Sequence, residues 1–293
     1  MSYPISFFDI PTMKGVMRLK VTTSFFLLVL SFIAYTVKAQ FNNNPISQFD
    51  ASDPATMRSR FNADAEAYFF VAEAKHYSMR FGYDYGLQNQ RHLFGLSLPF
   101  VHAIYVADFG GYENTTGVGD LKMRYMFVPY QQDKASGLQR VSTYLELTAP
   151  TGESALGRGA GTWVYRPGVI FTLRPNPEVS FYPEIKYQFS TKDANILSGD
   201  APDPDDTDVD GRISNLALSV PVIATVSSWN GWAGMNATYI QSFSEKTYYV
   251  FLRLDFGTMI GQKTSAALHV TKFIAGQLRL DALVQAKFQF FLR

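Results

Sequence analysis

A two-residue alternation of polar and apolar side chains recurs along this chain from about Met79 to the C-terminus, and it restricts the fold more than any other feature. Residues 120–127 place one acid and two cations on one face and leucine, methionine, tyrosine and phenylalanine on the other. Residues 180–189 and 279–290 repeat the arrangement. Because successive side chains of a strand point to opposite faces of a sheet, a period of two predicts β-strands.

The alternation predicts an all-β chain of about twelve strands. Most of them are longer than the roughly five or six residues of an average globular strand, and a tilted strand needs about 9–11 residues to cross a bilayer. No segment after the N-terminal region has eighteen consecutive apolar residues, so a helical span is not expected. The predicted strands are 65–73, 78–87, 92–100, 118–128, 140–150, 162–173, 179–190, 213–224, 232–243, 247–257, 264–274 and 278–291.

The two faces of these strands differ sharply in charge. The apolar face carries large residues such as Phe81, Leu96 and Leu254 and no charge, whereas the opposite face is charged on strand after strand. A dry core would not tolerate those charges, since each unpaired buried ion costs several kcal/mol. We therefore expect a closed antiparallel transmembrane β-barrel with lipid outside and a polar lumen inside. The predicted lumen-lining and gating residues are Arg80, Asp84, Asp120, Lys122, Arg124, Glu146, Glu184, Lys186, Arg253, Asp255, Arg279, Asp281 and Lys287.

The lengths of the connections support a barrel. Counted in turn, the three longest connections fall on one side: His102–Gly117, Thr151–Gly161 and Thr191–Arg212. The other side receives shorter turns, as in outer-membrane barrels with short periplasmic turns and longer external loops. A soluble periplasmic β-sandwich, the rival fold, has no reason to sort its loops in this way.

The N-terminus has the features of a secretion signal. A basic stretch at Met17–Lys20 precedes an apolar stretch at Ser24–Tyr35, and small residues flank a cleavage position between Ala39 and Gln40. We expect residues 1–39 to be an upstream extension with a cleaved signal peptide, 40–64 a periplasmic N-terminal segment, and 65–293 the barrel. The predicted location is the outer membrane of a Gram-negative bacterium.

Three short motifs carry a family resemblance. A strand opens with Gly117-Val118-Gly119-Asp120, another ends with Pro150-Thr151-Gly152, and a glycine-rich loop follows at 157–161. In this order the chain resembles the outer-membrane family named after the MetA pathway of phenol degradation, with Ala149 where part of the family has leucine. The resemblance implies an outer-membrane barrel with a transport function. Physically, Gly and Pro at these places are typical of corners between strands and loops, with contact to a ligand as the alternative.

One loop has the spacing of the front half of a calcium loop. Asp206, Asp208 and Asp210 alternate before Gly211, as oxygen ligands of Ca²⁺ do, but position twelve is Ala217 and not glutamate. The loop is interpreted either as a solvated acidic loop or as a weak Ca²⁺ site or divalent bridge to lipopolysaccharide. No other cofactor is expected. The chain has no Cys, and its formal net charge is +1 without a Lys/Arg cluster, which argues against nucleic acid as a partner.

The charges of the predicted lumen nearly balance, which favours cross-strand ion pairs and a narrow or gated pore over a sign-selective porin. The leading interpretation is a channel or transporter for small solutes, including hydrophobic or aromatic ones, gated by these charges and by loops 102–117 and 191–212. The alternative is a structural or surface-binding barrel without transport. An enzyme is not expected, since His269 has no Ser-rich elbow beside it. The predicted partners are outer-membrane lipid, lipopolysaccharide, the barrel assembly machinery and a small solute.

Overall fold

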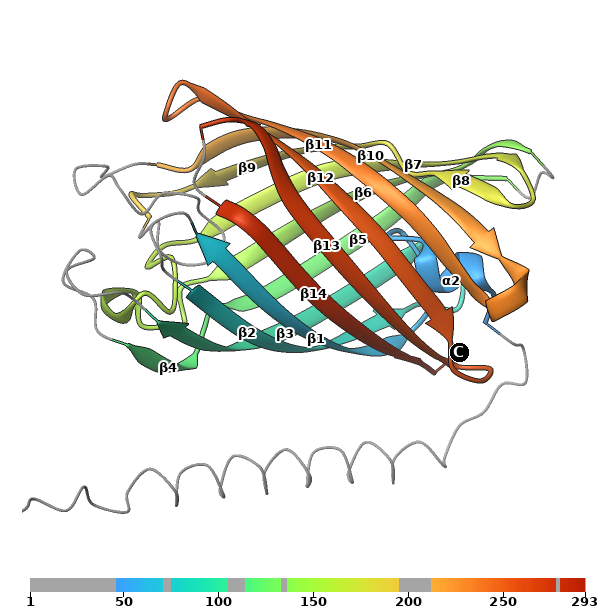
Figure 1. Ribbon diagram of the computed structural model, residues 1–293, viewed down its shortest axis with the longest axis horizontal. Coiled ribbons are helices and arrows are strands. Elements are labelled where there is room, and N and C mark those ends of the chain that lie inside the picture. The colour runs from blue at the N-terminus through green and yellow to red at the C-terminus, as the bar shows by residue number, and fades with distance from the viewer. Residues whose placement is uncertain are drawn as a thin grey trace, which may run out of the picture. The chain divides into compact units, whose positions relative to one another are not determined.

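The computed structural model describes residues 46–70, 75–104, 114–132, 136–194, 212–277 and 280–292. Within them, strand segments pair antiparallel into one sheet that closes on itself, because β10 pairs with both β9 and β11 (Figure 1). No helix in these ranges is long and apolar enough to span a membrane. The strands are β1 (Arg60–Phe70), β2 (Lys75–Gly86), β3 (His92–Ile104), β4 (Thr115–Val118), β5 (Leu121–Gln131), β6 (Gly137–Ala149), β7 (Val164–Asn176), β8 (Val179–Phe181), β9 (Glu184–Ser190), β10 (Ser214–Val226), β11 (Gly231–Ser242), β12 (Thr247–Met259), β13 (Thr264–Gly276) and β14 (Leu280–Phe291).

Two barrel positions are each occupied by a broken strand. β4 and β5 both pair with β3 and are separated by Gly119 and Asp120. β8 and β9 both pair with β7 and β10, and the break falls at Tyr182 and Pro183, where proline supplies no N–H to a ladder. Counted as single strands, these segments give the closed antiparallel barrel of twelve strands that the sequence predicts, which confirms the fold class.

The faces of the barrel are sorted by polarity. Apolar side chains stay exposed on the outside, where Leu96 keeps 52% of its surface accessible. On the inside, charged side chains are covered, and Asp255 retains only 1%. A soluble sandwich would bury its apolar face and expose its charges, so this pattern is that of a membrane barrel.

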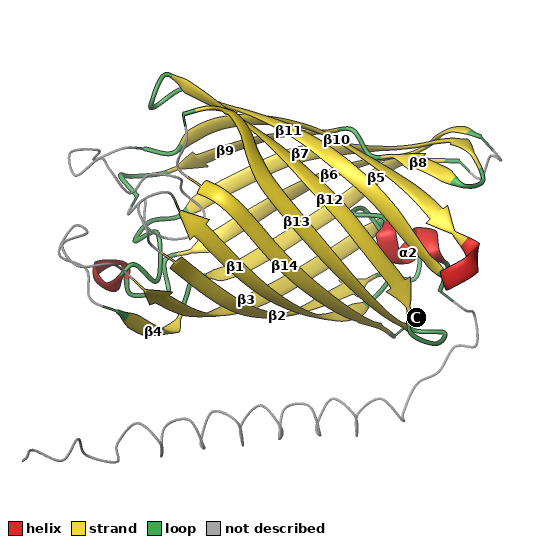
Figure 2. Ribbon diagram, viewed as in Figure 1, coloured by secondary structure: helices red, strands yellow, loops and turns green. Residues whose placement is uncertain are grey.

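Chain direction sorts the connections between the two ends of the barrel. One end, here the terminal end, holds the start of β1, the end of β14 and short turns, two of which use left-handed Gln90 and Asn230. The other, the loop end, holds the connections from β3 to β4, from β6 to β7 and from β9 to β10, so the predicted division of loop lengths is confirmed. Figure 2 shows how little of the described chain is helical: α2 (Gln48–Ser52), η1 (Ser154–Leu156) and η2 (Ser227–Trp229).

Residues 46–59, here the mouth segment, fold into the terminal end of the barrel (Figure 1). Ser47 caps α2 reciprocally with Asp50, which starts the helix. The segment then packs into the barrel on Ile46, Ala51, Ala55 and Met57, all buried. These side chains contact an inner wall of Leu93, Met126, Val128, Tyr144, Ile170, Tyr182, Ile223, Trp232, Met259 and Phe291.

The boundary between the N-terminal segment and the barrel falls at Arg60, five residues before the predicted start of the first strand. Arg60, Asn62, Asp64 and Glu66 alternate inward there and pair with both β2 and β14. Their outward neighbours include three alanines, whose small side chains give the outer face too little contrast for the alternation to be recognised from the sequence.

Candidate functional site

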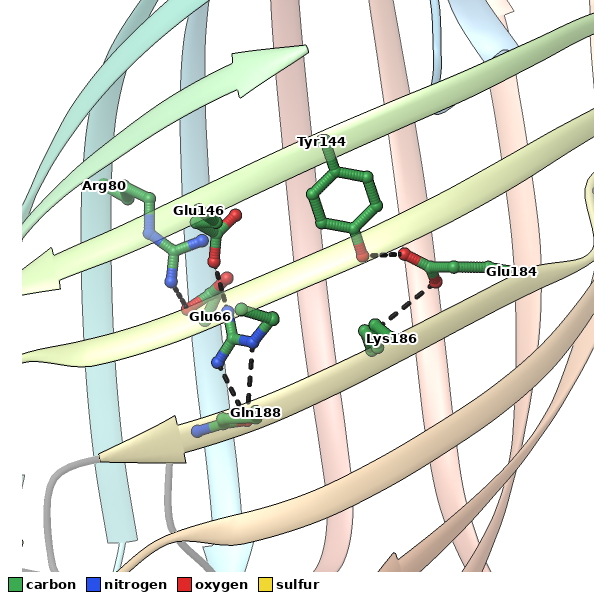
Figure 3. A network of polar contacts seen from close by, with 8 residues as sticks. Glu66, Arg80, Tyr144, Glu146, Glu184, Lys186 and Gln188 are labelled. Carbon is green, nitrogen blue, oxygen red and sulfur yellow. Dashed lines mark hydrogen bonds and ion pairs between the residues drawn. The ribbon is translucent and has the colours of Figure 1, made fainter. Parts of the chain in front are cut away.

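The inner wall carries a polar belt of ion pairs and hydrogen bonds. Arg60 on β1 binds Asp84 on β2 at 2.7 Å, and Asn62 donates to the same carboxylate at 2.9 Å. Nearer the loop end, Arg80 binds Glu66 at 3.1 Å (Figure 3). Both pairs join neighbouring strands, because the antiparallel register places oppositely charged side chains beside each other on the inner face.

Glu184 is held by three side chains of the belt. The Tyr144 hydroxyl on β6 donates to it across β7, and Lys186 binds it at 3.3 Å (Figure 3). The Ser219 hydroxyl on β10 also donates to it, at 3.1 Å. These contacts tie the barrel wall from β6 to β10. Arg166 on β7 adds a second tie, since its guanidinium binds Glu146 and donates to Gln188 at 3.1 Å.

A third group joins β12 to β13. Arg253 binds Asp255 at 2.8 Å, and His269 hydrogen-bonds the same carboxylate through Nδ1. His269 is the histidine whose sequence surroundings lack the Ser-rich elbow that a hydrolase would need. In the structure its ring is held by a carboxylate within the belt.

The predicted lumen residues differ in their surroundings. Arg80, Asp84, Glu146, Glu184, Lys186, Arg253 and Asp255 belong to the belt, and Arg124 lies with its guanidinium 5.0 Å from the Tyr144 ring centre. Lys122 and Asp120 line a small cavity near the loop end, and Lys287 lines the large cavity described below. Asp281 forms an exposed ion pair with Lys272. Arg279 and the acidic-loop residues Asp206, Asp208 and Asp210 lie outside the described residues, as do 105–113 and 195–211 of the two predicted gating loops.

Several inner-face charges were missed from the sequence. Arg60, Asp64 and Glu66 precede or open the strand predicted to start at 65, and Arg166 lies between aromatic and proline neighbours that hide the alternation. Arg140 binds Asp53 of the mouth segment. No local sequence pattern predicts this ion pair, because it joins residues from separate parts of the chain.

Asp120 holds the connection between β6 and β7 against the start of β5. Its carboxylate accepts from the backbone N–H of Gly152 at 2.8 Å and of Ala160 at 2.7 Å. Thr151 assists, since its hydroxyl accepts from the N–H of Leu121 at 2.8 Å. We call this arrangement of Asp120 and residues 151–160 the loop latch. The latch unites the three motifs that carry the family resemblance.

Close approach of backbone requires glycine at one position of the latch. A Cβ on Gly152 would lie 2.4 Å from the backbone carbonyl oxygen of Arg158, and one on Gly159 would lie 2.4 Å from the Asp120 carboxylate. Arg158 in turn donates to the Thr116 carbonyl at 3.0 Å and binds Glu153. All of these contacts join residues of the protein itself. They therefore support the interpretation of the motifs as corners between strands and loops over the alternative of ligand contact.

Two cavities lined by inner-face residues of the described chain differ in size. One of about 260 Å³ lies between the mouth segment and the wall formed by β7 to β14, and it is lined by belt residues and by apolar side chains. The other, of about 40 Å³, lies near the loop end between β1–β3 and Arg158 and Gly159 of the latch. Among the residues that the structure describes, no group of three or more His, Asp or Glu side chains is placed to hold a metal ion.

Tyr144→Phe is expected to destabilise the barrel, because Glu184 loses one of its two hydroxyl donors inside the protein. A hydrogen bond to a charged group contributes about 1.5–3 kcal/mol, which is the expected loss in the free energy of unfolding. Urea titration of the folded barrel in lipid vesicles measures it. Tyr187→Phe is the matched control, since that hydroxyl bonds Ser214 on the exposed face and its loss should change stability by less than about 0.5 kcal/mol. Equal losses in the two variants would contradict the prediction.

Comparisons with known proteins agree with this geometry. The model of a family described as "Putative MetA-pathway of phenol degradation" matches residues 42–251. No curated protein sequence matches. The COG4313 outer membrane channel from Pseudomonas putida F1 superposes with a TM-score of 0.60 at 13% identity, covering 80% of this chain and 95% of that one. The NanC porin gives 0.52 at 11%, covering 78% and 98%. At such identities the likeness shows a shared barrel fold.

Proposed function

Because this chain belongs to the family described as MetA-pathway of phenol degradation, we propose that it is an outer-membrane channel for small solutes, including hydrophobic or aromatic ones. The observation that carries the proposal is the cavity of about 260 Å³ inside a barrel with an apolar outer face. The fold shared with the P. putida outer membrane channel supports it.

The proposed mechanism is diffusion through a narrow lumen, with selectivity set by the belt. A solute entering at the loop end meets Arg158 and Gly159 of the latch, then the ion pairs of the belt, and then the large cavity beside the mouth segment. Each charged pair that it passes is bound within the protein, so a small solute can pass without leaving a buried charge unpaired. No step of this mechanism requires a catalytic residue or a cofactor.

The proposal extends to location and partners. We infer secretion with cleavage near Ala39/Gln40, insertion into the outer membrane of a Gram-negative bacterium by the barrel assembly machinery, and contact with lipid and lipopolysaccharide. The loop end would then face the outside and the terminal end the periplasm. Ca²⁺ binding by Asp206, Asp208 and Asp210 stays a prediction.

Reconstitution of the purified chain tests the channel. In planar bilayers we expect small conductance steps, and in liposome swelling assays faster entry of small solutes than of trisaccharides. Large and long-lived steps would contradict a narrow lumen. Absence of both conductance and solute entry would overturn the proposed function.

The mouth segment favours one alternative, a structural or surface-binding barrel without transport, because it occupies the terminal end of the lumen. A deletion strain distinguishes the two. Unchanged uptake of a broad panel of solutes together with altered envelope integrity would favour the alternative, whereas a selective uptake defect supports the channel.

A further inference from the structure

The carboxylates that line the large cavity are already bound within the protein. Glu184 is held by Tyr144, Lys186 and Ser219, and Asp255 by Arg253 and His269. Asp53 of the mouth segment is held by Arg140. A cationic ligand would therefore compete with existing partners for every carboxylate of this cavity.

Lys287 on β14 is in the opposite situation. It lines the same cavity, and its amine makes no hydrogen bond and no ion pair with any residue that the structure describes. Asp64 stands opposite it in the register of β1 and β14. The amine thus faces the cavity without a hydrogen bond or ion pair to any described residue.

Charged groups of both signs lie near Lys287. Asp64 and Asp84 attract its amine, whereas Arg60 and Arg124 repel it. Asp84 is also engaged at 2.7 Å by Arg60. Because opposite charges attract strongly where water is scarce, a carboxylate that reaches the Lys287 amine would be held there.

A second polar group in the cavity lacks a partner. Asn236 on β11 is 6% exposed, and its side-chain oxygen has no hydrogen-bond partner among the described residues. Its register neighbour on β10 is Pro221, which has no N–H to offer. An unsatisfied buried amide costs about 1–3 kcal/mol, so a ligand that bonds it gains affinity.

Apolar side chains supply the rest of the lining. Ile170, Tyr182, Ile223, Trp232 and Ala267 border the cavity beside Ala51 and Pro54 of the mouth segment. Ligand pockets of about 300–1,000 Å³ typically combine such a wall with a few polar groups that fix orientation. A cavity of about 260 Å³ lies just below that range and suits a small ligand.

We propose that this cavity is a binding site for a small amphipathic carboxylate, such as a single-ring or short-chain organic acid. Its carboxylate accepts from the Lys287 amine, a hydroxyl or N–H elsewhere on the ligand donates to the Asn236 side-chain oxygen, and its apolar body packs on the wall formed by Ile223 and Trp232. The inference rests on the proposed function in one respect, since it assumes that the permeating solute passes through this cavity.

Calorimetry on the full chain in non-ionic detergent tests the site with benzoate and its neutral analogue benzamide. Wild type should bind benzoate more tightly than benzamide. Lys287→Met should lose about tenfold or more of the benzoate affinity and leave benzamide binding unchanged, because the ion-paired hydrogen bond is gone. Lys287→Arg should keep the preference. Lys272→Met, which removes an exposed cation paired with Asp281, is the matched control and should behave as wild type.

The outcomes separate the inference from the channel proposal. Absence of benzoate binding, equal affinity for both probes, or unchanged affinity in Lys287→Met would overturn the inference while conductance in bilayers stays intact. Loss of benzoate binding in Lys272→Met would also overturn it, since the effect would then follow general surface charge. Failure of wild type to conduct or to admit solutes would instead overturn the channel, whatever benzoate does. Resistance of the unheated barrel to SDS establishes folding of each variant.

Discussion

Asp120→Ala is expected to open the loop end of the barrel and to make residues 151–160 accessible to protease. The carboxylate accepts two backbone N–H bonds, from Gly152 and from Ala160, and Ala160 is buried. Hydrogen bonds to a charged group contribute about 1.5–3 kcal/mol each, so the latch should weaken by roughly 3 kcal/mol or more. That loss changes the population of the released loop by more than about a hundredfold.

Two measurements report on the released loop. Trypsin should cleave after Arg158 in the variant, because the guanidinium would no longer be held by the Thr116 carbonyl and Glu153. The single-channel conductance should rise, since Arg158 and Gly159 line the narrow cavity at this end. Asp281→Ala removes a carboxylate from an exposed ion pair and serves as the control. A protease pattern and a conductance equal to wild type would show that the latch does not restrict the lumen.

Trp232→Ala is expected to produce the largest loss of stability at the terminal end. The indole is 2% exposed and belongs to the cluster that joins the mouth segment to the inner wall. Truncation of a buried aromatic residue removes apolar contacts and leaves a cavity, which costs about 3–5 kcal/mol. The barrel ladder itself stays hydrogen-bonded, so the loss should fall on the packing of the mouth segment.

Urea unfolding in lipid vesicles measures this loss, and protease access to residues 46–59 shows whether the mouth segment has left the barrel. Trp229→Ala is the matched control, because that indole lies on the turn between β10 and β11 and is largely exposed. Its truncation should cost less than about 1 kcal/mol. A similar loss in both variants, or a protected mouth segment in Trp232→Ala, would contradict the prediction.

Much of the barrel could be predicted because strand faces are a local property. Leu96 and Leu98 alternate with small and polar neighbours along β3, and no tertiary contact is needed to see that they share a face. The same reasoning is wrong at β1, where alanines stand at outward positions. The predicted strand starts at residue 65, so the inward-facing Arg60 and Asp64 fall in the segment before it. Alanine contrasts too weakly with polar residues to mark a face.

The polar belt shows where local reasoning ends. The sequence placed Glu184 and Lys186 on one inner face, but nothing in it predicted that Tyr144 reaches Glu184 across an intervening strand. That contact depends on the curvature of the closed sheet, which brings side chains of non-adjacent strands together. The latch is similar, since three separate motifs meet only because Asp120 reaches across to Gly152 and Ala160.

The sequence by itself determined that this chain forms long amphipathic strands with an apolar and a charged face, and hence a membrane barrel. It did so because strand alternation is encoded between neighbouring residues. Only the tertiary structure decided which charges pair, that the mouth segment enters the terminal end, and that Lys287 faces a cavity without a direct partner. These depend on register and closure, which bring together residues far apart in the chain.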